Sequence, residues 1–194
     1  LGILAGLPFR SSPDRFKWSC VAWAVISLGS VVALVGRIDV PSEGLLPLYL
    51  LPLATTISIL GQPVHEQHRQ SWMFTLLFLG LGLSALTSGP PISLLSLSLL
   101  LVLVAGLLYR HHSALWPRSW WGIGAYSLGA LCAAMSVIMD APWSSTASLL
   151  ACAVLLPLVP FHDGHLTALT RLPGSLPSFI VVLLPVGGLH LLAS

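Results

Sequence analysis

The most chemically suggestive residues of the sequence form the short motif His162-Asp163-Gly164-His165, which places two imidazoles three residues apart with a carboxylate between them. Neutral histidine gains and loses protons near physiological pH, so this spacing suits one step of a proton path, and it also offers two ligands to a metal. Two ligands do not complete a zinc site, and the sequence contains no evident third. Polar groups that cap a helix end are the simpler interpretation.

One further histidine, His190, lies within an apolar segment near the end of the chain. Together with His162, Asp163 and His165 it completes the candidate residues of a proton path. The run from His65 to Arg69 lacks the helix-spaced second histidine of a zincin motif, and it is interpreted as a solvated loop or a partner contact. No catalytic residue, metal site or cofactor is assigned from the sequence.

The composition indicates where these groups lie. The chain has 194 residues, of which 56% are hydrophobic and only 7% are charged, and its mean hydropathy is +0.93. A soluble domain usually carries about 25% charged residues. This chain has too few to cover a surface that faces water, so we expect an integral membrane protein in contact with the lipid bilayer. The net charge of +2 and the lack of a basic patch with interleaved aromatics exclude a nucleic-acid partner.

The apolar segments predict an all-α fold with about seven transmembrane helices. A spanning helix needs about 20 mainly apolar residues. Three of the seven segments are short at their stated edges, and prolines interrupt the second and the last. A proline frees a backbone carbonyl, which in lipid must find a partner, so these segments are expected to pack against protein. The segments are Trp18–Gly36, Leu45–Leu60, Trp72–Thr87, Ile92–Tyr109, Trp120–Met139, Ser148–Phe161 and Phe179–Leu192.

The loop charges predict an orientation. Seven of the eight Lys and Arg residues fall on one side of this topology, and only Arg37 falls on the other. The positive-inside rule then places the N-terminus in the cytoplasm. The membrane is expected to be the inner membrane of a bacterium. The whole chain, 1–194, is expected to form a single membrane domain. It would comprise a cytoplasmic arm at 1–17, a five-helix scaffold at 18–147, and a corner with the last helix at 148–192.

The sixth and seventh segments are separated by a corner rich in proline and glycine. An apolar run ends at Pro160 and Phe161, and the chain re-enters an apolar run after Pro173, Gly174 and Pro177. The few polar groups of this region gather at the corner. No Lys, Arg, Asp or Glu lies in the middle of any predicted span, although such residues normally mark ion and proton pathways.

Three parts of this region carry a family resemblance. Pro160-Phe161-His162, the element Leu176-Pro177-Ser178 and the following helix resemble the antiporter-like membrane subunits of respiratory NADH–quinone oxidoreductase and of Mrp-type cation/proton antiporters. That family has a Pro-Phe/Leu-His-x-Trp-Leu-Pro corner, followed by a Pro-containing element that opens the next helix. The resemblance covers about 45 residues, from 149 to 192.

The departures from the family pattern decide what the resemblance implies. The family places a membrane lysine about five residues before the corner, where this chain has Leu155, and the segment Ile92–Tyr109 lacks the partner glutamate. The resemblance therefore implies a shortened relative without the charged pair. Such a protein would be a structural or coupling subunit of a larger redox-linked or ion-translocating complex. It would have other membrane subunits as partners and would not be catalytic on its own.

Two alternatives stay open beside this reading. A proton or ion transporter, or a channel, would conduct along His162, Asp163, His165 and His190. A membrane-embedded metalloenzyme would use the same histidines as metal ligands.

Overall fold

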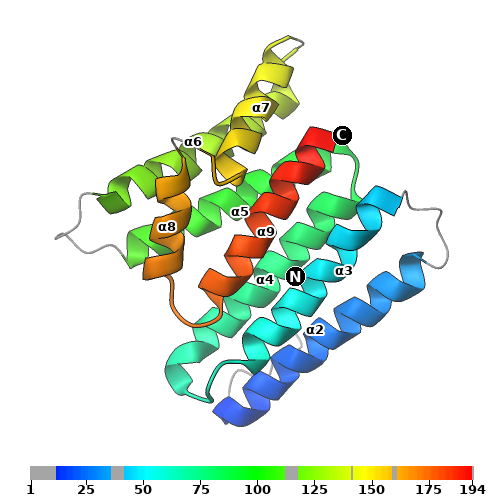
Figure 1. Cartoon of the computed structure of the whole chain (residues 1–194), viewed down its shortest axis with the longest axis vertical. Coiled ribbons are helices and arrows are strands. Elements are labelled where there is room, and N and C mark those ends of the chain that lie inside the picture. Colours follow the sequence, from blue (N-terminus) through cyan, green and yellow to red (C-terminus); the bar gives the residue numbers. More distant parts are fainter. Residues whose placement is uncertain (1–11, 36–41, 112–117, 141, 159–160, 194) are drawn as a thin grey trace. The chain divides into compact units, whose positions relative to one another are not determined.

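The structure is a computed structural model that describes residues 12–35, 42–111, 118–140, 142–158 and 161–193. These residues form eight α-helices and one short 3₁₀ helix, and none of them lies in a β-strand (Figure 1). The predicted all-α class is confirmed for this part of the chain. In order, the helices are α2 (Pro13–Val35), α3 (Ser42–Leu60), η1 (Glu66–His68), α4 (Arg69–Thr87), α5 (Pro90–Arg110), α6 (Arg118–Ile138), α7 (Trp143–Leu155), α8 (His162–Arg171) and α9 (Leu176–Ala193).

Five helical segments of the described chain are long and apolar enough to cross a membrane, and the protein is an integral membrane protein on this ground. These segments are Pro13–Val35, Glu66–Thr87, Pro90–Arg110, Trp120–Ile138 and Leu176–Ala193. Two shorter apolar helices, Leu45–Leu60 and Trp143–Leu155, correspond to the second and sixth predicted spans. The prediction of seven crossings stays a prediction for these two.

The region of the corner differs from the prediction in its helix boundaries. The sixth apolar helix, α7, ends at Leu155 rather than at Phe161. Residues 162–171, expected as loop, form the separate helix α8. Gly164 lies inside α8. It packs against α6, where a Cβ at this position would make ordinary van der Waals contact with the Tyr126 ring at 3.5 Å.

The described chain divides into two compact units. The first unit comprises Leu1–Gly80 together with Pro173–Phe179, and the second comprises Leu81–Leu172 together with Ile180–Ser194. Helices α4 and α9 each contribute to both units. The two units are described separately below.

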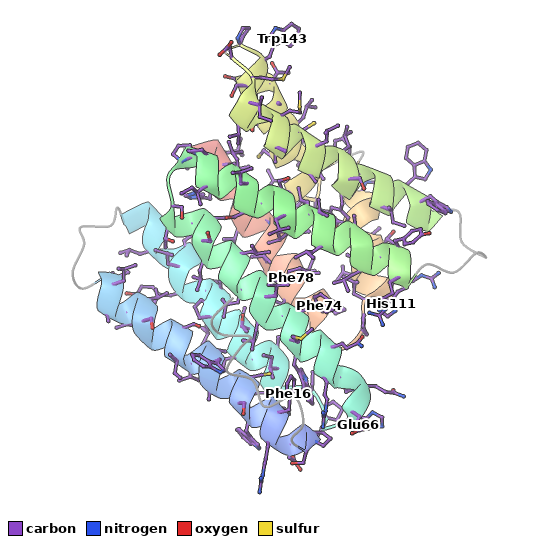
Figure 2. The ribbon with its side chains drawn as sticks, turned by 180° about the vertical axis from the view of Figure 1, so that it is seen from behind. Phe16, Glu66, Phe74, Phe78, His111 and Trp143 are labelled. Carbon is purple, nitrogen blue, oxygen red and sulfur yellow. The ribbon has the colours of Figure 1, made fainter. Side chains whose placement is uncertain are left out.

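In the first unit α2 packs beside α3, and the ends of the helices are joined by side chains (Figure 1). Lys17 is buried, and its ammonium group donates hydrogen bonds to the carbonyls of Leu60, at 3.1 Å, and of Gln62. These carbonyls lie at the C-terminal end of α3, where helix C=O groups have no partner within the helix. Phe16 of α2, labelled in Figure 2, stacks on the buried Trp72 of α4 with ring centroids 6.3 Å apart.

In the second unit α6 packs against α5, α7 and α8. Small residues permit these contacts. A Cβ at Gly129 would lie 2.8 Å from a methyl group of Val154 and 3.2 Å from one of Leu101, so three helices meet at this glycine. Ser98 of α5 donates a 2.9 Å hydrogen bond to the carbonyl of Ala130 in α6. Helix packing in membranes depends on such small residues because apolar burial alone does not drive association there.

Candidate functional site

The motif His162-Asp163-Gly164-His165 lies in the first turn of α8, whose N-cap is Phe161. His162 and Asp163 are adjacent, and His162 Nε2 lies 3.6 Å from Asp163 Oδ1. Both side chains are partly exposed, at 46% and 32% of their surface. The second ring nitrogen of His162, Nδ1, is buried and has no hydrogen-bond partner among the described residues. The structure therefore brings these two candidates together at the start of the helix.

His165 points elsewhere and has a different environment. It is buried, and its Nε2 lies 3.2 Å from the carbonyl oxygen of Val154 in α7. Burial lowers the pKa of the His165 imidazole below its ordinary value of 6.5, and hydrogen bonds to the carbonyls of Val154 and Leu156 oppose this shift. The geometry fits a neutral imidazole that donates its Nε2 proton to the end of α7, where carbonyls lack partners within the helix.

The Tyr126 ring of α6 forms another side of this environment. It meets the His165 ring edge to face, with centroids 6.0 Å apart. Tyr126 is 1% exposed, and its hydroxyl has no hydrogen-bond partner among the described residues. His165 thus caps a helix end, which is the simpler interpretation that the sequence offered for the motif. The helix that it caps is α7 and not its own helix, α8.

The remaining proton-path candidate, His190, lies near the end of α9 and is half-buried. It hydrogen-bonds the backbone carbonyl of Ala85. No hydrogen bond or ring contact joins it to His162 or His165 within the described residues. No group of three or more His, Cys, Asp or Glu side chains in the described ranges is placed to hold a metal ion.

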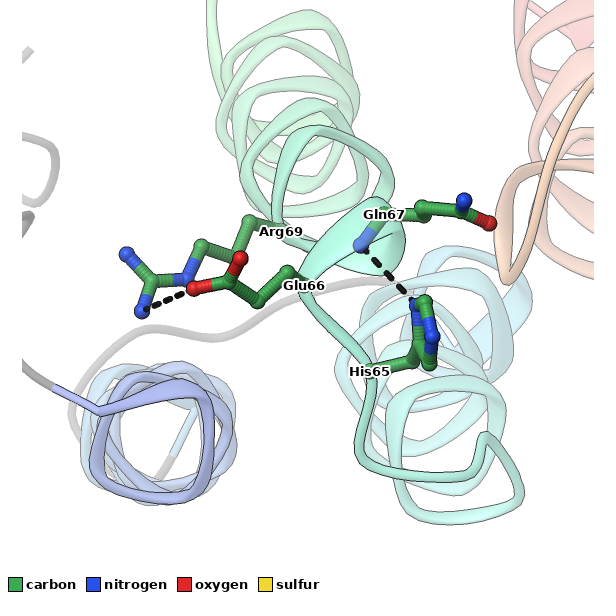
Figure 3. A network of polar contacts seen from close by, with 4 residues as sticks. All are labelled: His65, Glu66, Gln67 and Arg69. Carbon is green, nitrogen blue, oxygen red and sulfur yellow. Dashed lines mark hydrogen bonds and ion pairs between the residues drawn. The ribbon is translucent and has the colours of Figure 1, made fainter.

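The loop before α4 holds the other histidines discussed above (Figure 3). His65 precedes η1, and its Nδ1 accepts a 3.3 Å hydrogen bond from the backbone N–H of Gln67. Glu66 and Arg69 form an ion pair at 3.7 Å, and Glu66 is largely exposed. An exposed pair of this kind contributes little to stability, about 0–1 kcal/mol. These contacts order a local turn and do not assemble a site.

The described residues that were predicted to form the structural corner lie in two places, at the start of α8 and around the start of α9. Pro160 lies outside the described residues, and Phe161 caps α8. Gly174 has a φ of +64°, a left-handed conformation that residues with a Cβ rarely adopt, and it turns the chain between α8 and α9. Pro173 precedes this turn. Pro177 is the second residue of α9 and so lies within the first helical turn, where a proline is well tolerated.

A buried cluster of hydroxyl groups holds this turn in the first unit, and the sequence analysis did not identify it. Ser71 Oγ of α4 donates to the carbonyl of Pro173 at 3.0 Å and accepts from the backbone N–H of Ser175 at 2.9 Å. The hydroxyl of Ser175 lies 3.0 Å from Ser71 Oγ and 2.9 Å from Thr75 Oγ1. All three side chains are at most 1% exposed.

A second layer of the same cluster comes from α3. Ser58 Oγ donates to the carbonyl of Ser175 at 2.8 Å and lies 2.7 Å from Ser178 Oγ. We call Ser58, Ser71, Thr75, Ser175 and Ser178 the hydroxyl cluster. The spacing of Ser71 and Thr75, four residues apart on one face of a helix, was the available signal. It was missed because serine and threonine in apolar helices most often bond their own backbone.

No family model, curated protein or solved structure that we compared with this chain matches it.

Proposed function

We propose that this protein is a membrane subunit of a larger complex, antiporter-like in its last third, with a structural or coupling role and without pumping activity of its own. The observation that carries the proposal is the hydroxyl cluster around Gly174. Its buried part, Ser71, Thr75 and Ser175, joins α4 to the segment that resembles the antiporter-like family through hydroxyl and carbonyl groups. Such groups neither gain nor lose protons at physiological pH, so the network suits a fixed joint and not a relay.

The histidines of α8 support the same proposal. His165, which is buried, is already hydrogen-bonded to the carbonyl of Val154 at the end of α7. The lysine and glutamate of the family pattern are absent from the sequence at the corresponding positions, including Leu155. A chain with a fixed corner and no charged pair in its spans can transmit a movement or complete an assembly, and partner helices would supply the titratable groups.

The proposal is tested by gentle detergent extraction from native membranes, followed by native electrophoresis and mass spectrometry of the band that contains this chain. We expect membrane subunits of redox or antiporter-like sequence in fixed stoichiometry. The variant Gly174→Ala should weaken that association, because it distorts the turn, whereas Gly80→Ala should leave it intact, because a Cβ there meets no atom within 4 Å. A wild-type chain that migrates alone and monodisperse would contradict the proposal.

A second candidate function is proton or ion transport along His162, Asp163, His165 and His190. It is favoured by the 3.6 Å contact between His162 and Asp163 and by the buried, unpartnered Nδ1 of His162. This function predicts that His162→Ala abolishes proton flux in liposomes at normal expression. His111→Ala is the matched control, since His111 is an exposed histidine at the C-cap of α5 (Figure 2). Unchanged flux in His162→Ala and in His165→Ala would exclude this path.

A further inference from the structure

The second unit contains a pocket of about 340 Å³ between the first turns of α6 and α8. Most of its walls are aromatic or apolar, and one carboxylate reaches it. The residues that matter for recognition are Trp120, Trp121, Gly124 and Leu128 of α6, with Phe161 and Asp163 at the start of α8. Among the described residues that line the pocket, Asp163 alone carries a charge.

The pocket has a polar end and an apolar end. Along α6 it runs from Trp120 and Trp121 past Gly124 to Leu128, which is two helical turns or about 12 Å. The spanning segment of α6 begins at Trp120, and tryptophans at the start of a span lie at the level of the lipid head groups. Leu128 then lies deeper in the hydrocarbon, so the pocket follows the path of an amphiphile that enters from the interface.

Gly124 leaves the middle of this path open. A Cβ built at Gly124 meets no atom within 4 Å, so an acyl chain can lie directly against the backbone of α6. Leu128 is 47% exposed and continues the same apolar surface. The apolar half of the pocket therefore accepts a hydrocarbon chain without any rearrangement of side chains.

The head-group end favours a cation. The faces of tryptophan and phenylalanine rings attract ammonium groups, and tryptophan does so most strongly. Trp120 is 54% exposed and Trp121 is 76% exposed, and both side chains line the pocket. An edge-to-face contact with Tyr109, at 6.3 Å between centroids, orients the Trp120 ring. The carboxylate of Asp163, which lies 3.6 Å from His162 Nε2, lines the same pocket and adds a negative charge that disfavours an anionic head group.

We propose that this pocket binds a membrane lipid with an ammonium head group, of the phosphatidylethanolamine type. The ammonium group lies against the rings of Trp121 and Phe161 and beside the Asp163 carboxylate, and one acyl chain follows Gly124 and Leu128 along α6. The assignment depends on the membrane location of the chain and on the pocket. It does not depend on the proposed subunit function, and it shares Asp163 with the transport candidate.

The test is native mass spectrometry of the full chain in mild detergent, titrated with phosphatidylethanolamine or phosphatidylglycerol of the same acyl chains. We expect the wild type to retain phosphatidylethanolamine roughly fivefold better or more, the range of one desolvated cation–π contact. The variants Asp163→Asn and Trp121→Ala should lose this preference. Asp140→Asn and Trp143→Ala are matched controls, because these exposed residues follow the other end of α6, and they should keep it.

A pocket-filling variant separates this site from general lipid association. Gly124→Phe places a ring in the open space and should abolish the lipid preference, although Asp163 and the tryptophans are not substituted. Equal retention of the two lipids by the wild type would overturn the proposal, and so would an unchanged preference in Gly124→Phe. Soluble ethanolamine that binds as tightly as the lipid would overturn the lipid assignment, because the acyl chain would then contribute nothing.

Discussion

Replacing Gly174 by alanine is the sharpest test of how the chain is held at the turn between α8 and α9. The residue has a φ of +64°, and the left-handed conformation costs a residue with a Cβ roughly 1–2 kcal/mol. The new Cβ would also lie 2.5 Å from Ser71 Oγ and 2.8 Å from Ser71 Cβ. Contacts this short cannot persist, so Ser71 must move away from the turn.

The movement of Ser71 adds to the cost, because its hydroxyl bonds the carbonyl of Pro173 and the N–H of Ser175 in a buried setting. Each hydrogen bond of this kind contributes about 0.5–1.5 kcal/mol. The total expected destabilisation by Gly174→Ala is therefore about 2–4 kcal/mol, the sum of the backbone strain and of one or two weakened hydrogen bonds.

The assay is reversible unfolding in mixed micelles with increasing dodecyl sulfate, followed by tryptophan fluorescence. Gly80→Ala lies in α4, as Ser71 does, but meets no atom, and should change the free energy of unfolding by less than about 1 kcal/mol. In a Ser71→Gly background the two shortest contacts vanish and only a 3.2 Å contact with His68 Nδ1 remains, so Gly174→Ala should cost little more than the roughly 1–2 kcal/mol of backbone strain. Equal effects of Gly174→Ala and Gly80→Ala in the wild-type background would refute the reasoning.

Three further variants probe the polar contacts in the same unfolding assay. Ser175→Ala removes a buried hydroxyl that Ser71 and Thr75 both contact and should cost about 1–3 kcal/mol, whereas Ser30→Ala, which removes an exposed local bond, should cost under about 0.5 kcal/mol. Lys17→Met uncaps the end of α3 and should destabilise by about 1–3 kcal/mol, while the exposed Arg15→Met should have little effect. Stability should fall as the pH falls below 6.5, because unfolded His165 binds a proton that burial resists in the folded state. His165→Gln should flatten this slope, and an unchanged slope would contradict the assigned environment.

The helical membrane class followed from composition and apolar run length, and the helix boundaries followed only in part. Periodicity cannot locate the end of an apolar helix when apolar residues continue past it, as they do after Leu155. The helix α8 was missed because its ten residues are mostly polar and too short for a span. Its one strong signal, Asp163 in the first turn with Arg171 in the last, favours a helix through the macrodipole.

The candidate site was predictable to a similar degree. The adjacency of His162 and Asp163 is a property of the sequence, and the structure adds their 3.6 Å contact. The hydrogen bond from His165 to Val154 joins residues of two helices and had no local signal. The hydroxyl cluster joins α4 to residues about 100 positions later, and in the absence of covariation no single-sequence pattern indicates which serines will meet.

Two separate sets of polar groups make the proposed functions separable. Groups that hold the turn are hydroxyls around Gly174, and groups that can carry a proton are the imidazoles of α8. A subunit role depends on the first set, because a distorted turn presents a different surface to a partner, whereas transport depends on the second. Loss of companion subunits in Gly174→Ala with normal assembly in His162→Ala would favour the subunit role, and intact assembly in both with lost flux in His162→Ala would favour transport. The same turn is formed in either case, so stability alone cannot decide between them, and assembly and flux must be measured on the same two variants.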